Sequence, residues 1–387
     1  MTWPADLALS LVCVAVAAGG RPWVRAWERR TGVGLDGPTR WAAAAAVSFG
    51  LLQVAGMLLG FLDLLRPWTA ALAVGSVLLP ALLEVRRPSG LPSPWVLGGL
   101  GLVGVLLALA LVPPWYQDDM TYHLALPRTF AQAGGAVVPD DNIFASLPLG
   151  WESVLSLLCA LGPGPDRFPP FNPRLPGAWI AGAAALATAG LARSMGASGR
   201  IAGAAGLLLL LLPTFVHWAP SGYVEAWLVL LVALALQGGI RLARQEGAWL
   251  VPTAVAAGLA ASVKHTGLGV TAVIWALLAA NASRDPRPWR QAWAPVVRFA
   301  WIALLVGCPF YVRNLLERGN PFFPWAWSWF GGEGWDAWRA WAWGEILAGY
   351  GAGRSPIDWL LLPVRLFTTR DLFHGFEGSF GPFIGLG

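Results

Sequence analysis

Long apolar segments recur along the whole chain, and they constrain its fold more than any single motif does. Hydrophobic residues make up 56% of the 387 residues and charged residues only 12%, with a mean hydropathy of +0.58. The segments are continuous rather than alternating, and in lipid every backbone polar group has to be bonded within the protein. The sequence therefore predicts an all-α fold, that of a polytopic helical membrane protein.

The limits of these segments can be read approximately from the sequence. Those that reach or approach the about 20 residues of a membrane crossing are 7–20, 41–62, 68–85, 95–112, 176–191, 201–216, 223–240, 249–280 and 295–312. A further run, 154–161, is shorter. The sequence leaves open whether this run crosses the membrane at a tilt, re-enters it or is buried in the protein.

Arginine clusters indicate which ends of the segments face the cytoplasm. Arg21 to Arg30 follow the first segment, and Arg86 with Arg87 follow the third. Because cytoplasmic loops are enriched in arginine, the stretch 113–150 is predicted to be the first large external loop. The same bias accounts for the net charge of +5, so we expect a membrane and no nucleic acid as the partner of this surface.

The segments divide the chain into four parts. These are N-terminal spans (1–112), the external loop (113–150), a transmembrane core (151–312) and an external tryptophan-rich region (313–387). Within the loop, 122–133 is expected to form a short surface helix that Gly134 and Gly135 end. The last residues, GPFIGLG, resemble the start of a further span, so we expect more sequence beyond them.

A cluster of ionisable and aromatic residues opens the external loop. Asp118 and Asp119 come just past an apolar segment, and Tyr122 and His123 follow at once. Carboxylates at a helix end can simply be solvated at the interface, which is the alternative explanation. The added tyrosine and histidine favour a functional site.

The chain has a single lysine, Lys264, among 26 basic residues. It interrupts the apolar stretch 249–280 together with His265, and the arginine pattern places both residues on the external side, as it does Glu225. A lysine can snorkel to the interface from a helix end. Where arginine otherwise serves as the cation, one retained ammonium favours a role near a phosphate or a carboxylate.

Four strings resemble those of bacterial GT-C glycosyltransferases, the group similar to dolichyl-phosphate-mannose-protein mannosyltransferases. They are DDMTYHLALP (118–127), SLPLGWE (146–152), SVKHTGL (262–268) and RNLLERGNPFFP (313–324), and in order they are spread over about half the chain. The resemblance implies a GT-C-like transmembrane bundle in a bacterial plasma membrane. It also implies an enzyme that moves a sugar from a polyprenyl-phosphate carrier to a lipid, glycan or protein acceptor on the extracytoplasmic face. The family's catalytic aspartate falls on Asp118, with Asp119 beside it.

The residue types suit that chemistry. An acceptor hydroxyl needs a base when it attacks the anomeric carbon, and a single displacement inverts the configuration. Either one aspartate is the base and the other orients a partner, or both hold a divalent cation. The leaving lipid phosphate calls for cations. The residues expected to bind substrate are Tyr122, His123, Glu225, Lys264, His265 and Arg313.

Two other functions compete with transfer. A transporter or flippase of lipid-linked sugars would also use a charged break in a helix, whereas a non-catalytic scaffold would leave the polar cluster unexplained. The external region contains a group of tryptophans that is typical of an interface belt, although aromatic faces also suit sugar or isoprenoid contact. These are Trp325, Trp327, Trp329, Trp335, Trp338, Trp341 and Trp343.

Overall fold

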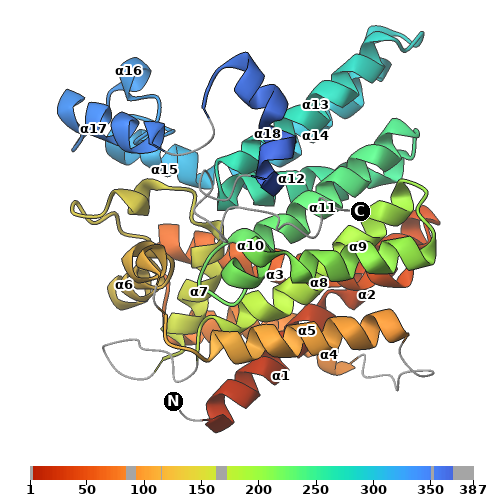
Figure 1. Ribbon diagram of the computed structural model, residues 1–387, viewed down its shortest axis with the longest axis horizontal. Coiled ribbons are helices and arrows are strands. Elements are labelled where there is room, and N and C mark those ends of the chain that lie inside the picture. Colours follow the sequence, from red (N-terminus) through yellow and green to blue (C-terminus); the bar gives the residue numbers. More distant parts are fainter. Residues whose placement is uncertain (1–2, 84–92, 115, 163–171, 350–352, 369–387) are drawn as a thin grey trace.

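The computed structural model describes residues 3–83, 93–114, 116–162, 172–349 and 353–368 (Figure 1). Throughout these ranges the regular structure is helical and no strand occurs, so the all-α prediction is confirmed. Arg86, Arg87 and the final GPFIGLG, which the sequence analysis used, lie outside the described residues.

The helices follow one another with short connections. The first half of the chain contains α1 (Trp3–Gly19), α2 (Arg21–Thr31), α3 (Gly37–Phe61), α4 (Pro67–Leu83), α5 (Pro94–Ala110), η1 (Asp119–His123), α6 (Ala125–Ala133), η2 (Ile143–Ser146), α7 (Gly150–Ala160) and α8 (Leu175–Ser194). The second half contains α9 (Gly199–Leu211), α10 (Pro213–Trp218), α11 (Glu225–Ala243), η3 (Gly247–Trp249), α12 (Leu250–Val263), α13 (Thr266–Ser283), α14 (Trp289–Gly307), α15 (Pro309–Arg318), α16 (Trp327–Phe330), α17 (Ala337–Ala348) and α18 (Pro356–Thr368).

Five helical stretches of the described chain are long and apolar enough to cross a membrane. They are Asp6–Thr31, Gly37–Phe61, Leu175–Ser194, Glu225–Ala243 and Thr266–Ser283, and the bent pair α14 and α15 would make a sixth. These lengths support a membrane protein. The first stretch runs through α2, so Arg21 to Arg30 lie on a helix and not in the loop that the sequence analysis expected.

Polar side chains tie the central helices together inside an otherwise apolar core. Gln53 on α3 donates to the Ser262 hydroxyl at 2.6 Å and accepts from the Trp227 indole at 2.6 Å. Gln237 on α11 donates to Thr39 at 3.0 Å. A buried amide needs such partners, because an unbonded one is costly away from water. The bonds therefore fix α3 against α11 and α12.

The short run 154–161 proves to be an interior helix. Residues 154–160 lie within α7, whose 11 residues are all buried, and Leu161 follows the helix half-buried. At 1.5 Å per residue α7 is about 16 Å long, roughly half of a hydrocarbon core of about 30 Å. Of the readings that the sequence left open, burial in the protein is the one that the structure supports.

Two breaks position the ends of helices that surround the site. The predicted break at Lys264 is confirmed, because α12 ends at Val263 and α13 begins at Thr266. The last span differs from expectation: it bends by 59° at Cys308, and Arg313, expected at its exit, lies buried within α15. Pro309 starts α15 and has no amide hydrogen to continue the hydrogen bonding of α14. This explains why the span bends at Cys308, before the end at Val312 that the sequence predicts.

Candidate functional site

Asp119 lies in a π-helical turn, η1, between α5 and α6, and Asp118 directly precedes this turn. The amide of Leu124 donates to the carbonyl of Asp119 at 2.9 Å, which inserts one extra residue into the turn. As a result Asp119 and His123 are buried, whereas Asp118 and Tyr122 are half-buried. The turn therefore gives the two neighbouring carboxylates different surroundings. The helix predicted over 122–133 follows as α6, which begins only at Ala125, and Gly134 ends it with φ of 79°.

Asp119 fastens this turn to the segment before α11. Its side chain is 0% exposed, and Oδ1 accepts the amide hydrogen of Gly222 at 2.9 Å. The indole of Trp151 donates to the carbonyl of Gly222 at 3.1 Å, so both backbone groups of this glycine are held. A Cβ at Gly222 would lie 2.9 Å from Asp119 Oδ1 and 2.8 Å from Leu124. Only glycine allows this close approach.

Burial raises the pKa of the Asp119 carboxyl from 3.8 to about 6. His123 and the Gly222 amide oppose the shift and Asp118 adds to it, but the loss of hydration dominates. Oδ2 of Asp119 is buried and has no hydrogen-bond partner among the described residues. Ionisation of Asp119 in the folded protein therefore lowers the free energy of unfolding.

Asp119→Asn is expected to stabilise the protein at alkaline pH. The folded state of the wild type binds more protons than the unfolded state between pH 3.8 and about 6, so its stability falls as pH rises through this window. This pKa shift corresponds to a loss of roughly 3 kcal/mol at most from the free energy of unfolding. Asparagine keeps an acceptor for Gly222 without the charge. The melting temperature of the purified variant in detergent should exceed that of the wild type at pH 8 and match it at pH 4; an equal difference at both pH values would contradict the assignment.

His123 pairs with a carboxylate that the sequence analysis did not select. Its Nδ1 lies 2.5 Å from Oε1 of Glu152, and both side chains are buried. Oε2 of Glu152 is buried and without a partner among the described residues. Glu152 is the acidic residue of the SLPLGWE string, so this string could have identified it as a candidate site residue. Nothing in the sequence showed that α7 would bring it to His123.

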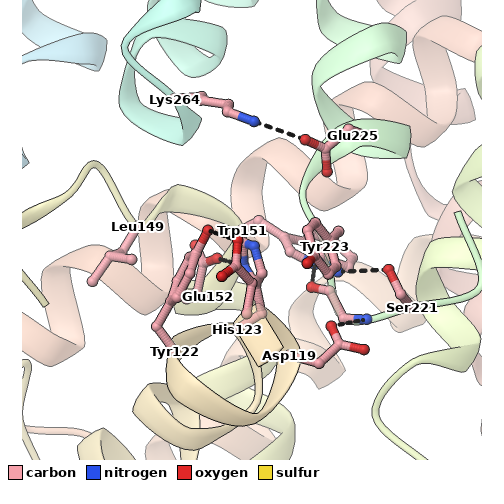
Figure 2. Close-up of polar contacts among 12 residues, drawn as sticks. Asp119, Tyr122, His123, Leu149, Trp151, Glu152, Ser221, Tyr223, Glu225 and Lys264 are labelled. Atoms are coloured by element: carbon pink, nitrogen blue, oxygen red, sulfur yellow. Dashed lines mark hydrogen bonds and ion pairs between the residues drawn. The ribbon is translucent and has the colours of Figure 1, made fainter. Parts of the chain in front are cut away.

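Lys264 and Glu225 form the other half of the cluster. Lys264 Nζ lies 2.8 Å from Glu225 Oε1, and the side chains are 47% and 24% exposed (Figure 2). Burial lowers the pKa of Lys264, but the carboxylates of Glu225, Asp118 and Glu152 together raise this pKa by more. The net shift is therefore upward. The lysine therefore stays cationic, and it lies at the same end of the helices as Asp118. Oε2 of Glu225 is buried without a described partner.

Tyr122 packs against His123, with ring centroids 4.0 Å apart. Its hydroxyl donates to Asp118 Oδ2 at 3.2 Å. Burial raises the pKa of the phenol, and the carboxylates of Asp118, Glu152 and Glu225 raise it further. The phenol is therefore a permanent donor that orients Asp118.

His265 and Arg313 lie apart from this arrangement. Burial lowers the pKa of His265 to about 4, so its side chain is neutral at pH 7 and does not provide a positive charge for the leaving phosphate. It packs edge-on to Tyr311, with ring centroids 5.6 Å apart. Arg313 is 6% exposed; it donates to the Ala145 carbonyl and to Asn314 and so fastens η2 to α15. Its described hydrogen bonds go to the wall of the site and not to the charged cluster.

Aromatic rings border the charged groups. Tyr122 stacks on Phe144 at 4.7 Å, and Tyr223 lies 4.6 Å from His123 and 4.2 Å from Trp218 between ring centroids. Such faces suit the apolar side of a sugar ring or an isoprenoid. Of the tryptophans after residue 313, Trp343 comes within 6.2 Å of Phe144 between ring centroids, whereas others such as Trp329 are largely exposed, as in an interface belt.

A divalent cation remains a prediction. Among the described residues no three His, Cys, Asp or Glu side chains are grouped as metal ligands. The carboxylate oxygens without partners, on Asp119, Glu152 and Glu225, could still contribute single ligands alongside a phosphate.

Comparison with protein-family models, with curated proteins and with solved structures gave no match. The resemblance to GT-C glycosyltransferases therefore stays an expectation from the quoted strings. What the site does has to be argued from its own geometry.

Proposed function

We propose that this protein is an inverting membrane glycosyltransferase of GT-C type, which moves a sugar from a polyprenyl-phosphate donor to an acceptor hydroxyl on the extracytoplasmic face. One observation carries the proposal. Four separate segments bring Asp118, Asp119, Glu152, Glu225 and Lys264 to one end of the helices, where three of the carboxylates each keep one buried oxygen without a hydrogen-bond partner among the described residues. Such concentrated, partly satisfied charge is typical of a site that binds and transforms a polar ligand.

The surroundings of the two aspartates favour Asp118 as the general base. Asp119 is 0% exposed and holds Gly222, so an acceptor hydroxyl cannot reach it without opening the turn. Asp118 is half-buried, is oriented by Tyr122 and interacts electrostatically with Lys264. In this assignment Asp119 positions the loop.

The reaction would then be one displacement. The acceptor oxygen forms a bond to the anomeric carbon while the bond from that carbon to the phosphate oxygen breaks. The acceptor proton passes to Asp118, and the bonding electron pair leaves with the polyprenyl phosphate. Attack from the face opposite the phosphate inverts the anomeric configuration.

The break between α12 and α13 supplies the positive charge for the leaving phosphate. Lys264 lies two residues before α13, an 18-residue helix that begins without a side-chain cap. The helix dipole at such an end attracts anions. The pair with Glu225 limits the positions open to the ammonium before the donor arrives.

Transfer by the purified protein tests the proposal. Protein in liposomes would be supplied with radiolabelled undecaprenyl-phosphate hexoses and pentoses, with octyl glycosides as soluble acceptors. We expect labelled disaccharide and free undecaprenyl phosphate from at least one donor. A donor that crosses the bilayer intact and yields no product would instead support the transporter, for which the charged break at Lys264 is the favouring feature.

A further inference from the structure

An apolar groove lies between α1, α3, α5, α8 and α9, away from the charged cluster. Its volume is about 580 Å³. Leu100 and Val96 on its α5 wall are 53% and 41% exposed, so the groove opens at the surface of the helices. Along α8 it extends from Trp179 to Arg193, a length of about 21 Å at 1.5 Å per residue.

One end of this groove is polar and aromatic. Arg193 lines it and lies 3.5 Å from Asp36 in a long ion pair, with 45% of its side chain exposed. Asp36 also caps α3, where its Oδ1 accepts from Thr39 at 2.8 Å. The guanidinium of Arg21 lies 4.5 Å from the ring of Trp41, which lines the same end. Cations beside tryptophan at a helix end mark the level of lipid headgroups.

This polar end is opposite the proposed catalytic end. Arg174, just before α8, contributes to the charge around Asp119, whereas Arg193 lies in the last turn of the same 20-residue helix. A donor whose phosphate lies near Lys264 therefore cannot place that phosphate at Arg193. The groove belongs to a different ligand.

We propose that the groove holds one acyl chain of an anionic phospholipid whose phosphate lies at Arg193. The apolar walls suit a hydrocarbon chain, and their length exceeds the about 15 Å depth of one leaflet. The arginines at the mouth suit a negative headgroup, because basic side chains at the membrane surface attract anionic lipid. The arginine pattern of the sequence assigns this end to the cytoplasmic leaflet.

Lipid binding by purified protein tests this assignment. Delipidated protein in detergent would be titrated with phosphatidylglycerol or phosphatidylethanolamine and observed by native mass spectrometry. We expect one tightly bound phosphatidylglycerol per chain. Gly99→Leu should weaken its binding about tenfold or more, because a Cβ at Gly99 would meet only Leu207 at 3.7 Å and a larger side chain would fill the groove. Arg193→Gln should reduce the preference for phosphatidylglycerol about fivefold.

Matched variants separate the groove from general effects. Gly104→Leu lies on the same helix, where a Cβ meets nothing within 4 Å, and Arg200→Gln removes an exposed arginine that does not line the groove. Both should bind lipid as the wild type does. Equal lipid binding by Gly99→Leu and Gly104→Leu would overturn the proposal. So would a dimer that Gly99→Leu alone abolishes, since a second copy would then occupy the groove.

Discussion

Asp118→Asn should lower the turnover of sugar transfer by about 10²- to 10⁴-fold, the range that a general base contributes. Asparagine has the shape of aspartate and can still accept from Tyr122, but it cannot take a proton from the acceptor. The Michaelis constant for the donor should change little. The measurement is the initial rate of disaccharide formation at saturating donor.

Two comparisons make this loss specific. Asp140→Asn removes a carboxylate of the same loop that is 98% exposed, and it should leave the rate within about twofold of wild type, because surface pairs contribute little. Asp119→Asn keeps an acceptor for Gly222, so it should leave transfer near the wild-type rate while it raises the melting temperature at pH 8. If Asp118→Asn kept wild-type turnover and Asp119→Asn abolished it, the roles of the two aspartates would be reversed.

The sequence predicts the helical architecture because lipid leaves few alternatives. Apolar runs and their interruptions locate the break at Lys264 and the end of the surface helix at Gly134, since both depend on residues close in sequence. The position of the last bend depends on how α14 and α15 pack as well as on Pro309. The apolar pattern alone predicted that the span ends at Val312, after the bend at Cys308.

The candidate site could be predicted only in part. Asp118, Tyr122, Glu225 and Lys264 stand out as ionisable or aromatic groups beside apolar segments. Glu152 reaches His123 across 29 positions of the sequence, and this pairing follows from α7 being buried among other helices. The different surroundings of Asp118 and Asp119 depend on the extra residue in η1, which hydrophobic periodicity does not reveal.

Removing the Lys264 cation should slow transfer by about 10²- to 10³-fold, the effect of losing one group that stabilises developing negative charge. Lys264→Met keeps the length of the side chain without its charge, so the loss should appear in turnover. Lys264→Arg should be slowed about tenfold, because a planar guanidinium replaces a compact ammonium in a position limited by Glu225. Arg287→Gln, in the exposed pair with Asp285 beyond the other end of α13, should behave as wild type.

A reversed pair separates the chemical role of this lysine from a structural one. In the double variant Lys264→Glu with Glu225→Lys, the ion pair that joins α11 to the break before α13 can form again, so the melting temperature should recover relative to either single variant. Turnover should stay low, because the ammonium then lies on α11 and no longer beside the first amides of α13. Recovery of both properties would mean that Lys264 only holds the helices together, and the phosphate would need another cation. Recovery of stability alone would place the positive charge at the start of α13 in the reaction itself.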